Sequence, residues 1–411
     1  MRAQTPTTDE VPDIEAHKIE FEITIAKLGR IGYGWPMEKI WTNSGDSHII
    51  EPDDLWRDNV PKQYAALMPH SVKDADGEWE TVHVDGHSFR RKLMGKAQLK
   101  FMQASMRAPG AFDVRKRLID LDQEGVWGEV VYPSLGLWNS SFTTRAALKA
   151  AITVSNNWCK SEVMDISPRL VPTAQVSMLS IDDAIEELER AAEMGYRAVF
   201  LPTTPPQATP DYNRDDWEPF WSAVEAAGMV VAFHIGTDPV VQEEGEQMGV
   251  AYRGPGGAVL NYTETTFSGQ RAAMKMVASG ALDRHQNMKV LISEGGATWV
   301  PFLGDRMTEG YRQHNMMVRP KLSRTPKEIL YSQVYASFQH DETAVAAVTA
   351  MGYQNVMFGS DYPHMEGTYG HTQETLQGLF AGVDAATQRR ITCGAFLDLF
   401  PEVGSPPALV A

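Results

Sequence analysis

Residues 170–201 read LVPTAQVSMLSIDDAIEELERAAEMGYRAVFL, and they contain a strand, a helix and a second strand in succession. The short apolar runs Leu170–Gln175 and Ala198–Leu201 are typical of buried strands. Between them, apolar residues recur at helical spacing through Ile181–Met194. A helix that connects two such strands predicts a parallel sheet of the α/β class.

The same alternation extends in both directions along the chain. The other predicted strands are Trp41–His48, Glu129–Tyr132, Val230–Ile235, Lys289–Ser293, Val334–Phe338 and Val356–Gly359. The other predicted helices are Asp113–Glu124, Ala146–Met164, Trp217–Ala227, Phe267–Ser279, Val300–His314, Glu342–Met351 and Gln373–Leu379. Eight strand–helix units predict closure into a (β/α)8 barrel, the TIM-barrel fold.

The predicted barrel occupies residues 41–400 of the 411-residue chain. Residues 1–40 are expected to form an N-terminal arm that packs on the barrel or on another subunit, so we expect a homo- or hetero-oligomer. A region inserted after the first strand, about residues 54–111, is expected to form a loop at the mouth of the barrel that can cover a substrate. The helix at 385–400 is predicted to cap the barrel, and residues 401–411 form a tail.

Composition excludes several classes of partner. The formal net charge is −16, so an acidic surface would repel nucleic acid and gain nothing from an anionic membrane. Only two cysteines are present, which excludes a disulfide framework and favours a reducing compartment. Residues 1–12 lack the apolar region of a secretory signal, and no apolar run is long enough to span a bilayer. We therefore expect a cytoplasmic protein that acts on a small molecule.

Polar residues stand at the ends of three predicted strands. Asp46 and His48 alternate at the end of the first strand, so both side chains point into the barrel. His234 ends the fifth strand, and Asp361 follows the eighth. Each motif alone could be a hydrogen-bonded polar residue, but a closed barrel brings all four positions to one rim. Imidazole and carboxylate ligands suit a divalent transition metal, so together they predict a metal site.

The chain resembles the amidohydrolase-related family that includes the aminocarboxymuconate semialdehyde decarboxylase-like enzymes. The matching motifs run from residue 46 to residue 364: DSHIIEP, LDQEGV, VVYPS, NNWCKSEV, PRLVP, FHIG, LISEGGATWVPF and FGSDYPH. The resemblance implies that Asp46, His48, His234 and Asp361 bind the metal, and that Asp361 takes a proton from water activated by it. The fourth strand ends Phe200-Leu201-Pro202 without a lysine, so a carbamylated-lysine bridge is not expected.

One departure from the family pattern concerns the reaction. Decarboxylases of this family usually carry a histidine after the sixth strand, where this chain has Glu294. Glu294 is a candidate ligand and catalytic residue, with a rim ion pair to Arg306 as the alternative. Glu51 is a candidate ligand that could instead cap the turn at Asp53–Trp56. His364 is a further candidate ligand. His340 is a candidate catalytic residue or a plain loop residue.

We therefore expect a metal-dependent enzyme that uses an activated water on a small organic acid or amide, by hydrolysis or by non-oxidative decarboxylation. The metal is expected to be zinc, manganese or iron, as one or two ions. Arg253, Arg306 and Trp138 are candidate substrate contacts, with surface or core placement as the alternative. A two-iron monooxygenase on the same barrel is the main alternative function. A non-catalytic partner subunit of a hetero-oligomer is the second alternative.

Overall fold

The computed structural model describes residues 39–92, 108–206, 208–237, 252 and 254–406. The chain divides into two units, residues 1–39 and 40–411, and the fold described below is that of the second. The predicted N-terminal arm lies outside the described residues, apart from residues 39 and 40.

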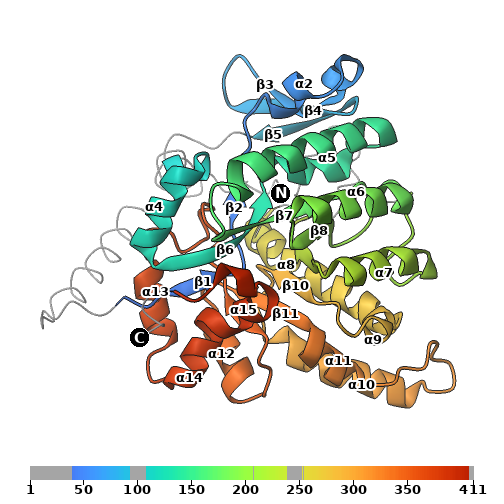
Figure 1. Ribbon diagram of the computed structural model, residues 1–411, viewed down its shortest axis with the longest axis vertical. Helices are drawn as coiled ribbons and strands as arrows, with labels where there is room; N and C mark the ends of the chain where they lie inside the picture. Colours follow the sequence, from blue (N-terminus) through green and yellow to red (C-terminus); the bar gives the residue numbers. More distant parts are fainter. Residues whose placement is uncertain (1–38, 93–107, 207, 238–251, 253, 407–411) are drawn as a thin grey trace, which may run out of the picture. The chain divides into compact units, whose positions relative to one another are not determined.

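A parallel sheet forms the centre of the second unit (Figure 1). Its strands are β1 (Thr42–Ser44), β2 (His48–Ile49), β6 (Val126–Pro133), β7 (Leu170–Gln175), β8 (Ala198–Pro202), β9 (Val230–His234), β10 (Val290–Ser293), β11 (Val334–Phe338) and β12 (Val356–Phe358). They pair in the order β1-β6-β7-β8-β9-β10-β11-β12, and β2 also pairs with β6. The predicted first strand, Trp41–His48, is thus two short strands, β1 and β2, that share β6 as a neighbour.

The first and last strands approach each other and nearly close the barrel. The Gly45 N–H donates to the carbonyl of Phe358 at 2.8 Å, and Ser47 forms a parallel bridge with Tyr362. Further along, the Asp361 N–H donates to the carbonyl of Asp46 at 3.0 Å. The predicted (β/α)8 barrel is therefore confirmed.

Helices surround the barrel (Figure 1). The main ones are α4 (Val114–Glu124), α5 (Arg145–Cys159), α6 (Ile181–Met194), α7 (Glu218–Ala227), α8 (Gly257–Ala278), α10 (Trp299–Gln313), α11 (Pro326–Gln333), α12 (Glu342–Thr349) and α13 (Thr372–Leu379). Local sequence sets their ends: α4 begins where the Asp113 side chain accepts the N–H groups of Arg115 and Lys116, and it ends at Gly125, with φ 79°.

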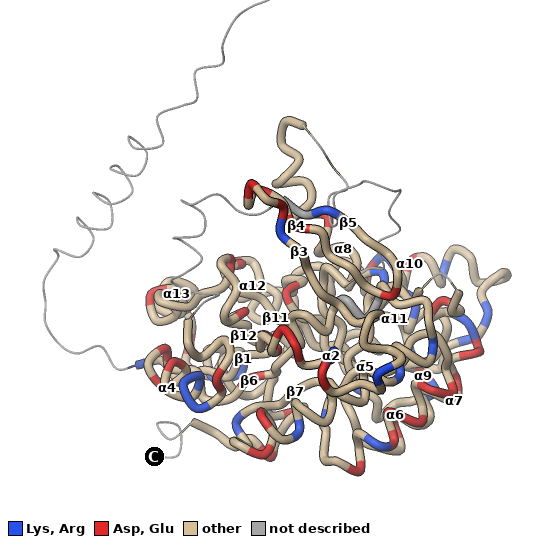
Figure 2. Tube along the Cα trace, turned by 90° about the horizontal axis from the view of Figure 1, so that it is seen from above, with Lys and Arg blue, Asp and Glu red and all other residues tan. Residues whose placement is uncertain are grey.

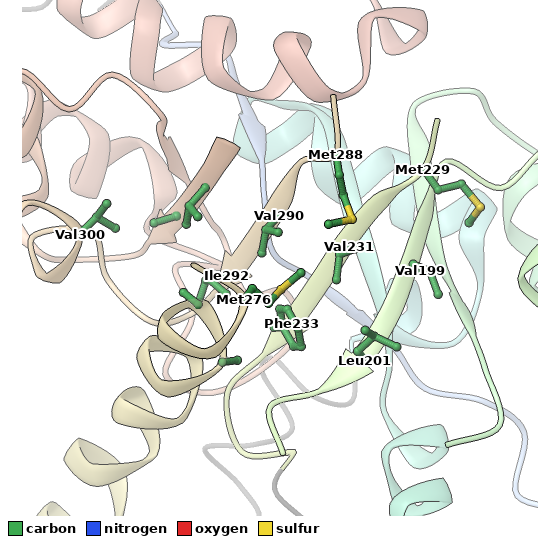
Figure 3. Close-up of a cluster of buried hydrophobic side chains, with 14 of the residues drawn as sticks. Val199, Leu201, Met229, Val231, Phe233, Met276, Met288, Val290, Ile292 and Val300 are labelled. Carbon is green, nitrogen blue, oxygen red and sulfur yellow. The ribbon is translucent and has the colours of Figure 1, made fainter. Parts of the chain in front are cut away.

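Alternation along each strand separates two cores. On β9, Val231 and Phe233 point outward to the helices, together with Val290 and Ile292 of β10 (Figure 3). The inward positions form a second cluster: Val130, Tyr132, Val171, Ala198, Phe200, Val230, Ala232, Leu291, Tyr335 and Met357. His234 follows Ala232 by two residues, so it shares the inward face.

The C-terminal helices close one end of the inner core. They are α14 (Ala385–Arg389), a π-helical turn at Arg390–Gly394 and α15 (Ala395–Leu399). Phe396, Leu399 and Phe400 pack directly against the inward-facing strand residues. This agrees with the capping role expected for residues 385–400.

The insertion after the first strand has a regular structure that we did not predict. It contains α2 (Leu55–Asn59) and a three-stranded antiparallel sheet of β3 (His70–Lys73), β4 (Trp79–Val84) and β5 (His87–Lys92). Asp85 and Gly86, with φ 49° and 80°, form the tight turn between β4 and β5. Val82 and Val84 are buried beside Trp56, Leu148 and Ile152, so this sheet packs on α2 and α5 rather than hanging free as a loop.

Three features of the surface and composition can be followed in the structure. Acidic residues are spread over the helices, including α6 and α7 (Figure 2). Cys159 and Cys393 are both buried and free. Within the described ranges, no helix is both long and apolar enough to cross a membrane.

Candidate metal centre

Four side chains that are distant in sequence meet at the carboxyl ends of the barrel strands. They are Asp46 between β1 and β2, His48 in β2, His234 at the end of β9 and Asp361 after β12. All four residues are buried, and each offers a ligand atom within 4.8 Å of the others. The structure therefore brings together the four residues that sequence analysis had proposed for one site.

The two imidazoles are oriented by backbone carbonyls. The Nδ1 of His48 lies 3.3 Å from the carbonyl of Pro133, and the Nδ1 of His234 lies 2.7 Å from the carbonyl of Ile235. Each contact favours a proton on Nδ1 and turns Nε2 toward the other histidine, and the two Nε2 atoms lie 2.9 Å apart. Metal-binding histidines are commonly held in this way, with one ring nitrogen on a backbone carbonyl and the other free for the ion.

The two carboxylates lack conventional partners. Both side-chain oxygens of Asp46 and of Asp361 are buried and accept no well-aligned hydrogen bond, although His364 Nδ1 lies 2.8 Å from the Asp361 Oδ1. The Asp46 Oδ1 lies 3.3 Å from the Nε2 of His234 and 3.8 Å from the Nε2 of His48. Burying two unsatisfied carboxylates costs free energy unless a positive charge accompanies them. Two nitrogen and two carboxylate donors that converge in this way fit a divalent transition metal.

Burial and neighbouring charges shift the pKa values in opposite directions. Burial, together with His364 and His234, holds the pKa of His48 well below its usual value. Burial also lowers the pKa of His234, but Asp46 and Glu294 outweigh it and raise that pKa to about 10. Without an ion, His234 is therefore charged and can donate its Nε2 proton to neutral His48. A bound cation would take the place of that proton.

Asp361 lies in a constrained turn. Its φ is 52°, a left-handed conformation that costs a non-glycine residue on the order of 1 kcal/mol. Burial raises the pKa of the Asp361 carboxyl, with Asp46 adding to the effect and His364 opposing it, to about 6. The Nδ1 of His364 lies 2.8 Å from the Asp361 Oδ1, and the His364 ring stacks on that of His48 at 4.1 Å.

Glu294 also borders the cluster. It follows β10 with φ 62°, and its Oε2 lies 3.5 Å from the Nε2 of His234. Burial and the nearby Asp361 carboxylate raise the pKa of Glu294 well above its usual value. Its proposed ion-pair partner, Arg306, is exposed on α10. Glu294 thus adds a third carboxyl group, with a raised pKa, beside the two carboxylates and two histidines.

The carboxylate of Glu51 has a different place from the one we expected. It accepts the backbone N–H groups of Ser134, Leu135 and Gly136 at 3.1, 2.8 and 2.9 Å. Both oxygens are therefore engaged by the segment that follows β6, rather than by the turn at Asp53–Trp56. The structure gives Glu51 the role of anchoring that segment, and we leave it out of the proposed ligand set.

Substitution of Glu51 distinguishes the anchoring role from a role as a metal ligand. We expect Glu51→Ala to lower the free energy of unfolding by about 3 kcal/mol, because three backbone donors lose a buried charged acceptor. Chemical denaturation measures this change. Metal content per folded chain should stay at the wild-type value, and a loss of metal in this variant would instead return Glu51 to the ligand set.

Of the remaining candidates, only His364 contacts the cluster within the described part of the structure. His364 belongs, with Asp361 and Glu366, to a second group that could hold an ion. His340 is exposed, with its Nε2 3.2 Å from the carbonyl of Glu366. Arg253 and the side chain of Trp138 lie outside the described part of the structure.

Sequence analysis missed the buried ion pair of Arg117 and Glu129. Both residues are 0% exposed, and the Arg117 Nη1 donates to the carbonyl of His48 at 2.7 Å. A signal was present, because Arg117 falls three residues after Val114 and four before Leu121, on the buried face of α4. A charged residue on an apolar helix face requires a buried partner.

Comparison with known proteins identifies the family. The sequence profile of the amidohydrolase family, described as Amidohydrolase, matches residues 132–397. Since this is more than half of the chain, the protein belongs to the amidohydrolase family. No curated protein matches the chain.

Solved structures show the same fold. An amidohydrolase from Mycobacterium avium subsp. paratuberculosis K-10 has a TM-score of 0.68 and 17% identity, over 88% of this chain and 99% of that one. The 2,6-dihydroxybenzoate decarboxylase from Rhizobium has a TM-score of 0.61 and 17% identity, over 89% of this chain and 99% of the decarboxylase chain. A dihydroxybenzoic acid decarboxylase from Polaromonas with bound manganese has a TM-score of 0.60 and 15% identity, over 88% and 97%.

Proposed function

We propose that this protein is a metal-dependent hydrolase or carboxy-lyase that acts on a small organic acid or amide. The observation that carries the proposal is the convergence of two histidine Nε2 atoms and two buried carboxylates at the strand ends of the barrel. Asp46, His48, His234 and Asp361 would hold one divalent ion. The manganese in the Polaromonas decarboxylase supports an ion of this class.

Two carboxyl groups beside the proposed ion, those of Asp361 and Glu294, would divide the proton transfers. A divalent ion in such a site makes water more acidic and polarises a substrate oxygen. Asp361 can accept a proton, and His364, whose Nδ1 lies 2.8 Å from the Asp361 Oδ1, can orient the carboxylate. Glu294, whose pKa is raised by burial and by the Asp361 carboxylate, is placed to donate one. Acid and base roles are commonly separated by environment in this way.

A small, mainly apolar pocket of about 30 Å³ lies next to the segment that carries His234 and would accept a small apolar group of a substrate. Phe200 and Pro202 of β8 line it, and Pro202 lies opposite His234 in the sheet register. Thr237 lines its other side, where its hydroxyl donates to the His234 carbonyl at 2.7 Å. The remaining lining residues are Gly136, Leu137, Leu148, Gln175, Val176 and Met178. An apolar group seated here would bring an attached carboxyl or amide toward the candidate ligands.

Metal analysis and a substrate screen test the proposal together. We expect the purified protein to contain about one divalent transition metal per chain, measured by elemental analysis. The manganese- and zinc-loaded protein should then be assayed on 2,6-dihydroxybenzoate and 5-carboxyvanillate for loss of carbon dioxide, and on small amides for hydrolysis. Protein that takes up no metal at micromolar concentration would overturn the proposal.

A two-iron oxygenase is the second candidate, and one observation favours it. Asp361, His364 and Glu366 form a second potential ligand group that shares Asp361 with the first. An ion there would lie next to the first ion, as a two-metal reaction requires. Two irons per chain, with oxygen consumption in the presence of a reductant, would favour this candidate. A single zinc or manganese that is active without oxygen would eliminate it.

A further inference from the structure

We propose that Arg117 and Asp120 of α4 act as a clamp that sets the spacing between the two segments bearing the candidate ligands His48 and Asp361. The inference rests on the metal centre proposed above. Both clamp residues project from one face of α4, three positions apart. Neither touches the cluster with its own side chain in the way a ligand would, so we regard them as positioning residues.

Arg117 holds the His48 segment. Its Nη1 donates to the His48 carbonyl at 2.7 Å, and its Nε is bonded to the buried carboxylate of Glu129 on β6. The His48 N–H in turn donates to the carbonyl of Tyr362 at 2.6 Å. The backbone of His48 is therefore fixed on both sides, which fixes the direction of its imidazole.

The same helix holds the Asp361 segment through Tyr362. The Arg117 guanidinium lies over the Tyr362 ring, 4.6 Å from its centroid. One turn further, the Asp120 Oδ2 accepts the Tyr362 hydroxyl at 2.7 Å. Because Tyr362 directly follows Asp361, these contacts restrain the left-handed turn that aims the Asp361 carboxylate at the two histidines.

Gly110 shows how closely the clamp is fitted. A Cβ at this position would lie 2.4 Å from the Asp120 Oδ2 and 2.6 Å from the Tyr362 hydroxyl. It would also approach the Arg117 Cα at 2.7 Å. A side chain here would therefore enter the clamp, although Gly110 itself contributes no group to it beyond a 3.5 Å contact from its carbonyl to Arg117.

Arg169 provides a matched control. It also bonds to an α4 carboxylate, that of Asp122 at 2.7 Å, and stacks over an aromatic ring, that of Trp127 at 4.4 Å. It also donates to backbone carbonyls, those of Trp127 at 2.5 Å and Val126 at 3.1 Å. These carbonyls lie at the start of β6, so Arg169 restrains no ligand-bearing segment.

The experiment compares Arg117→Met, Gly110→Ala and Tyr362→Phe with Arg169→Met in the metal-free full-length protein. Affinity for Mn²⁺ is measured by chelator competition, and ligand geometry by the visible spectrum of the Co²⁺-loaded protein. We expect a loss of about 10–100-fold in Mn²⁺ affinity for Arg117→Met and Gly110→Ala, with a changed Co²⁺ spectrum. Tyr362→Phe, which removes a single hydroxyl, should lower the affinity for Mn²⁺ only a few-fold. Arg169→Met should bind as the wild type does.

Amide hydrogen exchange gives a readout that does not depend on metal. We expect faster exchange at residues 46–48 and 360–364 in Arg117→Met and not in Arg169→Met. Wild-type metal affinity in Arg117→Met, or an equal loss in Arg169→Met, would overturn the clamp. If the wild-type protein binds no Mn²⁺, the proposed metal centre is overturned instead. Unchanged amide hydrogen exchange in Arg117→Met would overturn the clamp even in that case.

Discussion

Replacing His234 with alanine is expected to lower affinity for Mn²⁺ or Zn²⁺ by at least about 100-fold. Residues that only orient a ligand change metal affinity by about 10–100-fold, so loss of a direct ligand should exceed that range. The substitution also removes the positive charge beside Asp46, which is 3.3 Å away, and beside Glu294. Turnover of any substrate identified in the screen should disappear with the metal. Chelator competition and elemental analysis measure the change.

His285 supplies the control for this substitution. It is also a buried histidine paired with carboxylates, since its Nδ1 lies 2.9 Å from Glu225 and its Nε2 3.1 Å from Glu218. It belongs to neither of the two potential metal-binding groups. His285→Ala should therefore reduce stability and leave metal affinity unchanged. Equal metal binding by His234→Ala and wild type would exclude His234 as a ligand. It would also favour a non-catalytic role for this chain.

Most strands were predictable because they are short, largely apolar runs between turn residues, although the first strand, Thr42–Ser44, is polar. Leu170–Gln175 and Val334–Phe338 are strands with the predicted bounds, since both faces of a parallel strand are buried and the run stops where burial stops. The candidate ligands were predictable for the same reason. A polar residue such as His234, at the end of an apolar run, stands out from its neighbours.

Contacts between distant segments were not predictable from one sequence. The anchoring of Ser134–Gly136 by Glu51 depends on which loop lies next to the first strand, and no local pattern encodes this. The sheet inserted before α4 was missed although residues 81–84 alternate as a half-buried strand does, and no local pattern shows that its valines pack on α2 and α5. The clamp at Arg117 has the same character, because its partners come from β2, β6 and the turn after β12.

Metal binding should stabilise the fold by mass action, and we expect this to be the largest stability effect in the protein. A ligand that binds only the folded state adds about 4 kcal/mol to the free energy of unfolding at 1,000 times its Kd, and about 1.4 kcal/mol for each further tenfold increase. The site exists only in the folded chain, because Asp46 and Asp361 are more than 300 positions apart in the sequence. Chemical denaturation at stepped concentrations of free Mn²⁺ measures this slope.

The variants separate the metal-dependent part of the stability from the rest. In His234→Ala, the free energy of unfolding should not rise with Mn²⁺ over the concentrations at which the wild type responds, because the Kd of the variant lies above them. His285→Ala should have a lower free energy of unfolding without metal, and this free energy should rise with Mn²⁺ concentration as steeply as in the wild type. Arg117→Met should show the wild-type slope displaced to metal concentrations about 10–100-fold higher, which is the clamp's effect expressed as stability. A wild-type protein whose stability does not change with Mn²⁺ would mean that the four converging side chains hold no ion. The buried carboxylates of Asp46 and Asp361 would then be compensated by the neighbouring imidazoles of His234 and His364 alone.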